Sequence, residues 1–215
     1  MKNFKNIQQK TEAWHEIKWG RIGGTLSKGL FVKSDTLLID LLYQRCEDFI
    51  YVPEGFINDA MERGNTLEPL ARVYLEEYLD VKFEETGWIQ SEENELLGMS
   101  PDGLTEDETI QCEIKCFGGK KHYETLLADD IPLENIHQCL HAFTVNPKLE
   151  KLYFIAFRPE SPKPFIKMLD RNSEINMGTK AKPKMFTIID AVSMSRYAAN
   201  ELLINLELNE SQLKL

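Results

Sequence analysis

The chain has 215 residues, 42% of them hydrophobic, and a formal net charge of −10. This length can bury one sizeable core, so we predict a single domain over residues 1–215. No apolar run approaches the length of a membrane span, and the first residues lack the apolar stretch of a signal peptide, so no membrane partner is expected. Four Cys without a framework spacing indicate reduced thiols and a cytoplasmic protein.

Hydrophobic periodicity and turn residues predict alternating helices and strands. In chain order the predicted elements are a helix capped at Thr11 over 11–19, a helix over 36–49, a helix within 56–79, strands over 82–90, 96–101 and 109–117, a helix over 133–145, strands over 151–157 and 164–169, and a helix over 195–208. Ile136, Leu140 and Phe143 are expected to face the core. The pattern predicts an α/β fold with a mixed central β-sheet flanked by α-helices.

The region 56–79 contains a candidate acidic residue. Pro69 fits the first turn of a helix, where its missing N–H costs little, so this helix is expected to begin near Asn65 or Thr66. Glu68 then lies in that first turn, where the helix dipole favours a carboxylate. Two interpretations stay open at this point: Glu68 completes a functional site, or it is a capping-box acid after Asn65.

Residues 96–117 contain the most informative pattern. Their composition predicts a β-hairpin, in which a turn rich in Gly, Asp and Glu joins strands 96–101 and 109–117. Because side chains alternate along a strand, Gln111, Glu113 and Lys115 are expected to share one face. The other face carries Ile110, Cys112, Ile114 and Cys116. We therefore expect the apolar set to be buried and the charged set to face a cleft.

Asp102 ends the first arm of this hairpin, so the turn can bring its carboxylate beside that of Glu113. Two neighbouring carboxylates repel each other unless a cation lies between them, and oxygen ligands without paired soft ligands favour Mg²⁺, with Mn²⁺ as a substitute. Lys115 can then hold the attacking water or stabilise charge on a phosphate. These residue types indicate a metal-dependent phosphodiester nuclease, although Pro-Asp-Gly is also a common turn and Glu-x-Lys a common solvated strand face.

Five short blocks follow one another between residues 8 and 160. They are Trp14-His15-x-x-Lys18-x-Gly20-x-Ile22-Gly23-Gly24-Thr25, Arg63-Gly64-x-x-x-Glu68-Pro69, Ser100-Pro101-Asp102-Gly103, Glu113-Ile114-Lys115-Cys116, and Gln138 on a helix. The ordered series resembles the phage lambda-type exonucleases, also called YqaJ-like viral recombinases, of the PD-(D/E)xK nuclease superfamily. The series is far more specific than any one block.

The resemblance implies a restriction-endonuclease-like core and an enzyme that digests one strand of linear double-stranded DNA from its 5′ end. It also implies a requirement for Mg²⁺, a ring-shaped homotrimer threaded by DNA, and recombination beside a single-strand annealing protein. The expected setting is the cytoplasm of a bacterial or phage-infected host cell.

The resemblance also implies a role for individual residues. Asp102, Glu113 and the backbone carbonyl of Ile114 would bind the metal, and Glu68 would complete the metal site. Lys115 would be the catalytic lysine and Gln138 the polar residue beside the catalytic strand. The residues implied to bind DNA or its terminal phosphate are Trp14, Lys18, Arg21, Thr25 and Ser100.

The sequence departs from the family at the phosphate position, where the family often has an Arg and this chain has Lys18. A Lys lacks the bidentate fork of Arg, so phosphate recognition is looser or Arg21 serves instead. Thr25 keeps a hydroxyl for the phosphate. The Gly23-Gly24 pair could add backbone N–H donors to an anion pocket, and it is equally typical of a plain turn.

Several alternatives remain. The net charge of −10 opposes DNA binding, which depends on neutralised phosphates, although Lys115, Lys120, Lys121 and the basic tract at 180–184 could supply local positive charge. An endonuclease of restriction or repair type and a catalytically silent DNA-binding protein are the rival functions. A zinc site at His137 and His141 lacks a third ligand with convincing spacing, and the four Cys lack the spacing of an iron–sulfur cluster.

Overall fold

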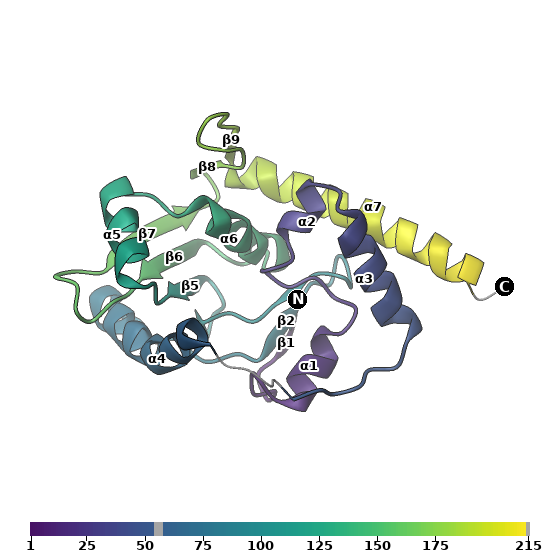
Figure 1. Cartoon of the computed structure of the whole chain (residues 1–215), viewed down its shortest axis with the longest axis horizontal. Helices are drawn as coiled ribbons and strands as arrows, with labels where there is room; N and C mark the ends of the chain where they lie inside the picture. The colour runs from purple at the N-terminus through teal and green to yellow at the C-terminus, as the bar shows by residue number, and fades with distance from the viewer. Residues whose placement is uncertain (54–57, 214–215) are drawn as a thin grey trace.

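The structure is a computed structural model, which describes residues 1–53 and 58–213. Its elements, in chain order, are β1 (Lys2–Phe4), α1 (Glu12–Lys18), α2 (Lys28–Phe31), α3 (Asp35–Cys46), α4 (Asp59–Leu79), β2 (Trp88–Gln90), β3 (Gly98–Met99), β4 (Gly103–Leu104), β5 (Ile110–Lys115), α5 (Gly119–Ala128), α6 (Leu133–Val145), β6 (Lys151–Ala156), β7 (Phe165–Asp170), β8 (Glu174–Asn176), β9 (Met185–Thr187) and α7 (Ile188–Leu213) (Figure 1).

The central sheet is mixed and flanked by helices, as predicted. Its strand order is β4-β5-β6-β7, with β5 parallel to β6 and the other two pairs antiparallel. The five predicted strands do not form one sheet, however, because β2 and β3 pair with β1 in a separate antiparallel sheet. Pro101 lies between β3 and β4, and a proline cannot donate to a strand ladder. The arm predicted at 96–101 is therefore only Gly98–Met99, and the hairpin partner of β5 is β4.

Both faces of β5 are covered, which corrects the expectation that its charged face opens onto a cleft. On one face Cys112 and Ile114 pack with Ala71 and Leu75 of α4. On the other face Glu113 is 3% exposed. A strand that pairs in parallel with its neighbour is normally buried on both faces, because helices cover the sheet on each side.

Helix α4 begins well before the predicted start at Asn65 or Thr66. The Asn58 side chain caps it by accepting hydrogen bonds from the backbone N–H groups of Ala60 and Met61, at 3.0 and 2.9 Å. Residues 56 and 57 of the predicted segment lie outside the described residues. Pro69 is in the interior of the helix, where packing of one helical face against β5 outweighs the lost hydrogen bond.

Glu68 therefore lies in the middle of α4. The interpretation that it is a capping-box acid after Asn65 is wrong, because the helix is capped seven residues earlier at Asn58. Its side chain lines a cleft that is also lined by Asp102, just before β4, and by Ile114 and Lys115 of β5.

Helix α6 has the predicted bounds and is the central element of the core. Ile136, Leu140 and Phe143 are each at most 4% exposed, as expected. His141 is also buried, and its Nε2 lies 2.8 Å from the carbonyl oxygen of Gly98 and 3.1 Å from that of Ile22. One imidazole therefore ties α6 to β3 and to the segment that follows α1.

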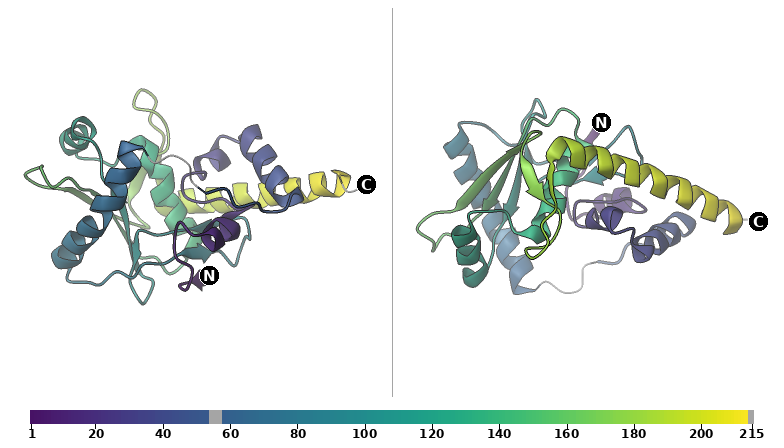
Figure 2. Two further views of the ribbon diagram at one scale, coloured as in Figure 1. Left: turned by 60° about the horizontal axis from the view of Figure 1, so that its bottom comes forward. Right: turned by 90° about the horizontal axis from the view of Figure 1, so that it is seen from above.

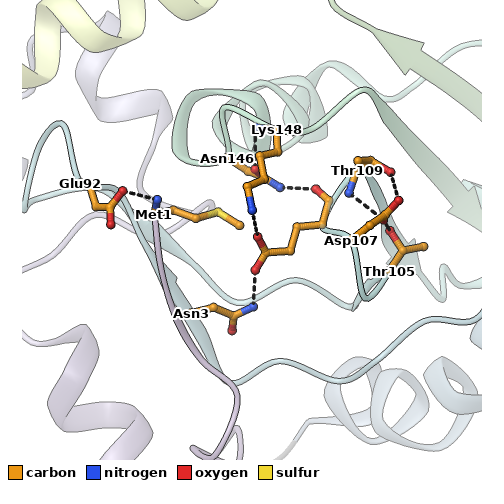
Figure 3. A network of polar contacts seen from close by, with 9 residues as sticks. Met1, Asn3, Glu92, Thr105, Asp107, Thr109, Asn146 and Lys148 are labelled. Atoms are coloured by element: carbon orange, nitrogen blue, oxygen red, sulfur yellow. Dashed lines mark hydrogen bonds and ion pairs between the residues drawn. The ribbon is translucent and has the colours of Figure 1, made fainter.

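The turn between β4 and β5 is fixed by a polar network (Figure 3). Glu108 accepts hydrogen bonds from Asn3 of β1 and from Lys148, at 3.0 and 2.9 Å. Asn146, the C-cap of α6, donates to the backbone carbonyl of Glu108 at 2.8 Å. Asp107 receives the hydroxyl of Thr105 at 2.6 Å within the same turn. These bonds hold the start of β5 against both the N-terminal strand and the end of α6.

Helix α7 begins at Ile188, seven residues before the predicted start, and extends away from the sheets (Figure 2). Ile188, Ala191 and Val192 are buried, so its first turns belong to the core. An ion pair between Arg45 of α3 and Glu210 attaches its far end to α3. Within the described residues, no helix combines the length and apolar character needed to cross a membrane.

We expect His141 to make the stability of the fold depend on pH. Burial lowers its pKa, although the two backbone carbonyls oppose this by raising it. The unfolded chain then binds a proton near pH 6.5 and the folded chain does not, so the stabilisation is complete above that pH and is lost as the pH falls. Relative to His141→Gln, the wild-type free energy of unfolding should fall more steeply below pH 6.5, by up to about 1.4 kcal/mol per pH unit.

Urea unfolding of both proteins between pH 7.5 and 5 measures this difference. Taking the difference between the two profiles removes the contribution of the acidic groups, which are common to both. Parallel profiles would show that His141 is not the responsible group.

Candidate active site

Residues from α4 and the end of β5 line one cleft, which we call the carboxylate cleft. Glu68 comes from the middle of α4 and Asp102 from the residues just before β4. Ile114 and Lys115 are the last two residues of β5. Glu68, Asp102 and Ile114 are three of the four residues assigned to the metal site from the sequence, and Lys115 is the predicted catalytic lysine; the fourth, Glu113, does not line this cleft. The carboxyl end of a parallel strand is where α/β folds commonly place functional residues. The cleft is also lined by Lys10, Ala60, Met61, Arg63, Gly64, Asn65, Cys116, Phe117 and Gly118.

Glu113 and Lys115 form a close ion pair at this site. Their Oε1 and Nζ atoms are 2.6 Å apart, and the side chain of Glu113 is 4% exposed. Burial raises the pKa of Glu113 to about 7, against the lowering effect of Lys115. Burial would lower the pKa of Lys115, but the charges of Glu113 and Asp102 more than offset this and raise it. Lys115 is therefore a cation under all physiological conditions.

Asp102 is held by backbone hydrogen bonds on both sides. Its Oδ2 accepts from the N–H of Ile114 at 2.7 Å, which places the carboxylate beside β5 as the sequence predicted. Its own carbonyl accepts from Nε of Arg72 at 2.7 Å. Burial raises the pKa of Asp102, and Lys115 acts in the opposite direction. The carboxylate is thus poorly solvated, and Asp102 lines the carboxylate cleft.

Arg72 links three parts of the site, and the sequence analysis missed it. Besides Asp102, its guanidinium contacts Glu68 at 3.1 Å and forms an ion pair with Glu85. Its side chain is only 12% exposed. The four-residue spacing from Glu68 is a sequence signal for a pair on one helix face, and it could have indicated this contact. A second arginine of α4, Arg63, donates to the backbone carbonyl of Cys116 at 2.9 Å.

Three carboxylates at or beside the cleft, those of Glu68, Asp102 and Glu113, are oxygen donors of the kind that a hard divalent cation prefers. Oε1 of Glu113 is buried, and its partner is the ammonium group of Lys115, 2.6 Å away. Burial and, after it, the charge of Asp102 raise the pKa values of Glu68 and Glu113, and the charge of Glu68 adds to the rise at Glu113. Over residues 1–53 and 58–213, no three His, Cys, Asp or Glu side chains converge on one point. Each carboxylate has a partner inside the protein: Glu68 pairs with Arg72, Asp102 accepts the N–H of Ile114, and Glu113 pairs with Lys115. The charge or dipole of each partner partly replaces that of a cation.

A second hollow adjoins α1, and we call it the α1 pocket. It contains all five residues implied to bind DNA, together with Gln138 of α6. These residues come from three blocks, at positions 14–25, 100 and 138, and the fold brings them to one pocket. The pocket is lined by Gln9, Trp14, His15, Lys18, Trp19, Arg21, Gly23, Gly24, Thr25, Leu26, Gln44, Trp88, Ser100 and Gln138.

The polar groups of the α1 pocket already make contacts within the protein. Nζ of Lys18 lies 3.3 Å from the ring centroid of Trp14. Arg21 donates to the carbonyl of Ile17 at 2.5 Å, while its Nε is buried without a hydrogen-bond partner. Burial lowers the pKa of Arg21. The Ser100 hydroxyl accepts from Trp14 at 2.8 Å and donates to the carbonyl of Gly87 at 2.7 Å.

Gln138 lies in the α1 pocket and not in the carboxylate cleft. It packs closely on the glycine turn, since a Cβ added to Gly24 would lie 2.9 Å from Cγ of Gln138. Gly24 is therefore needed for close approach of backbone and side chain, which is a more specific role than that of a plain turn.

The two hollows are neighbours. Gln9 lines the α1 pocket and Lys10 lines the carboxylate cleft, while in the segment between β3 and β4 Ser100 lines the pocket and Asp102 the cleft. The Gln9 side chain joins these two segments, because its Nε2 donates to the carbonyl of Pro101 at 3.2 Å. On both segments, the residue that lines the pocket and the residue that lines the cleft are therefore only one or two positions apart.

The alternative metal centres are not supported by the described residues. His141 is used by backbone carbonyls and His137 packs against Phe31 at 5.1 Å between ring centroids. All four Cys are free, and Cys112 and Cys139 are buried. The basic tract at 180–184 lies in the loop between β8 and β9, on the side of the molecule away from α1 (Figures 1 and 2).

A mixed sheet with carboxylates and a lysine at the end of a buried strand is the arrangement of the restriction-endonuclease-like fold class. The chain belongs to the YqaJ-like viral recombinase domain family, whose model matches residues 13–147. The predicted resemblance, the fold class and the enzyme class, a nuclease that acts on DNA, are thereby confirmed. A search of the curated proteins found no match.

Solved structures show the same fold. An alkaline exonuclease from Laribacter hongkongensis, LHK-Exo, superimposes with a TM-score of 0.76 at 23% identity, covering 95% of this chain and 96% of that one. Its complex with dAMP gives a TM-score of 0.72 at 23% identity, covering 95% and 98%. A phage-related exonuclease from Haemophilus somnus 129PT gives 0.51 at 11% identity, covering 90% and 96%.

The position of Arg72 predicts a large effect of its removal. Arg72→Ala leaves the carboxylate of Glu68 and the carbonyl of Asp102 without their partner in a half-buried setting, and we expect a loss of about 2 kcal/mol or more in the free energy of unfolding. Lys82→Ala is the matched control. Lys82 forms an ion pair with Glu76 of α4, but its side chain is 87% exposed, so its removal should cost under about 0.5 kcal/mol. Denaturant unfolding at pH 7.5 measures both, and equal losses would contradict the proposed linking role.

Proposed function

We propose that residues 1–215 act as one nuclease domain, an Mg²⁺-dependent exonuclease that degrades one strand of linear double-stranded DNA from its 5′ end for recombination by single-strand annealing. The observation that carries this proposal is the adjacency of the α1 pocket and the carboxylate cleft. A cationic pocket two residues from the carboxylates suits a terminal phosphate, with the scissile phosphodiester in the cleft. An internal cleavage site would not need such a pocket.

Asp102, Glu113, Glu68 and the carbonyl of Ile114 would hold the metal ion, Mg²⁺ or Mn²⁺. When bound, such an ion polarises a phosphoryl oxygen and lowers the pKa of a water ligand. Lys115 remains charged and lines the cleft, so it can orient the attacking water and stabilise negative charge on the phosphate. Gln138 lines the neighbouring pocket, where its amide can position the terminal nucleotide.

In the α1 pocket, Lys18 and Arg21 supply the positive charge, and Thr25 supplies a hydroxyl. Lys18 lies over the Trp14 ring and Arg21 is partly buried, so both are held in place before a phosphate arrives. Ser100 orients Trp14 through its hydroxyl, which makes its contribution to DNA binding an indirect one in this structure. These local cations answer the objection raised by the net charge of −10.

The family resemblance supports the remaining parts of the proposal. These are a ring-shaped homotrimer around DNA, a single-strand annealing protein as partner, and action in the cytoplasm of a bacterial or phage-infected cell. The alternative activity is internal cleavage by a restriction- or repair-type endonuclease, and closed circular DNA distinguishes the two because it offers no end.

We expect Asp102→Ala and Glu113→Gln to abolish Mg²⁺-dependent cleavage of end-labelled linear DNA without loss of the fold, because each removes a carboxylate from a crowded acidic site. Lys115→Ala should lose roughly 100-fold or more in rate and still bind metal, since the ammonium group does not ligate the ion. Cleavage assays combined with isothermal titration of Mn²⁺ measure both effects. Undiminished cleavage in either carboxylate variant would remove the proposed metal site.

Terminal phosphate recognition predicts a preference between DNA ends. Linear DNA with a 5′-phosphate should be degraded faster than DNA with a 5′-hydroxyl, because the additional negative charge and oxygens are favourable only in a cationic pocket. Lys18→Ala or Arg21→Ala should erase this preference and leave the slower reaction intact. Equal wild-type rates on the two ends would argue against the pocket, and digestion of closed circular DNA would favour the endonuclease.

A further inference from the structure

Lys10 has a backbone conformation that lysine rarely adopts. Its φ angle is +66°, in the left-handed region that favours glycine and disfavours residues with a Cβ. The conformation is imposed from both sides. Gln9 donates to the carbonyls of Thr86 and Pro101 at 2.9 and 3.2 Å, and Thr11 caps α1 immediately after Lys10. Strained residues that the surroundings over-determine are concentrated at functional sites.

The side chain of Lys10 lies at the carboxylate cleft. Its Nζ donates to Oδ1 of Asn65 at 2.7 Å, across the cleft on α4. The charge of Lys10 lowers the pKa values of Glu68 and Asp102, against burial, which raises them. The ammonium group is therefore within electrostatic reach of two residues proposed to hold the metal.

Lys10 differs from the other cations of the cleft in its exposure and its partner. Lys115 pairs with Glu113, and Arg63 is committed to the carbonyl of Cys116. Lys10 is exposed and its hydrogen-bond partner is a neutral amide. In the part of the chain that the structure describes, no carboxylate is within ion-pair distance of it. Its ammonium group therefore has a hydrogen bond to a neutral amide and no ion pair, and a phosphate oxygen can replace Asn65 as the acceptor.

We propose that Lys10 is a DNA-binding residue that contacts a backbone phosphate of the cleaved strand where it passes from the α1 pocket to the carboxylate cleft. The proposal rests on the proposed exonuclease function, because that function places a strand across both hollows. Lys10 is the residue at their junction: Gln9, its neighbour, lines the pocket and Lys10 itself lines the cleft. The strained backbone keeps the side chain at this junction.

The chain offers a matched control. Lys33 has φ +47° and is the other lysine with a left-handed backbone among the described residues. It lies far from the site, where its Nζ is 3.5 Å from Glu201 and its side chain is 81% exposed. Replacing either lysine by glycine relieves the same backbone strain, but only Lys10→Gly removes a charge from the cleft.

The test compares Lys10→Gly, Lys10→Asn, Lys10→Arg and Lys33→Gly with the wild type. DNA affinity is measured by fluorescence anisotropy on blunt duplex DNA with Ca²⁺ in place of Mg²⁺, over a series of salt concentrations. We expect Lys10→Gly to bind about fivefold more weakly at 0.15 M salt, with the slope of log K against log salt reduced by about 0.9, as for one lost phosphate contact. Its melting temperature should hold or rise, because the strain is gone.

The other variants separate charge from structure. Asn tolerates the left-handed region, so Lys10→Asn should bind as weakly as Lys10→Gly, whereas Lys10→Arg should retain the wild-type affinity and slope. Lys33→Gly should bind and cleave DNA like the wild type. Unchanged affinity and slope in both Lys10→Gly and Lys10→Asn would overturn the proposal. A wild-type protein that cleaves no linear DNA would instead overturn the proposed function, which is a separate result.

Discussion

Burial of β5 on both faces is the constraint on which the rest of the site depends. Because α4 packs on one face and Glu113 is only 3% exposed on the other, any charge on this strand has to find a partner inside the protein. Glu113 and Lys115 satisfy this requirement together, 2.6 Å apart. A carboxylate in this position is expensive to leave unpaired, and a divalent cation is a stronger partner than a neighbouring ammonium group. Under the proposed function, the same burial that covers the strand would favour binding of a metal ion.

The position of α4 relative to β5 is set by two arginines at opposite ends of the cleft. Arg63 reaches the backbone of Cys116 and Arg72 reaches the backbone of Asp102, so the helix is attached both beyond β5 and before β4. Glu68 lies between these attachments. An acid on a helix and an acid on a turn can act on one phosphate only if their distance is fixed, and these hydrogen bonds fix it.

The N-terminal segment connects the two hollows of the molecule. The chain passes from β1 through Gln9 and Lys10 into α1, and Gln9 binds it to the turn that contains Asp102. His141 binds the segment after α1 to β3, so both ends of the α1 pocket are attached to the core. The segments that line the α1 pocket are thereby anchored to the core. Under the proposed function, this anchoring would help to keep a terminal phosphate at a constant distance from the carboxylates.

Local sequence determined much of this protein. The bounds of α6, the Thr11 cap of α1, the mixed character of the central sheet and the five blocks that identify the family all follow from periodicity, capping chemistry or residue order. The start of α4 and the division of the strands between two sheets could not be predicted, because packing on β5 overrides the preference of Pro69 for a first turn. Only the tertiary structure revealed Arg72 as the link between Glu68 and Asp102, and the proximity of Lys10 to the carboxylates. Contacts between residues 30 or more positions apart depend on how the elements pack, and a pattern along the chain carries no record of that geometry.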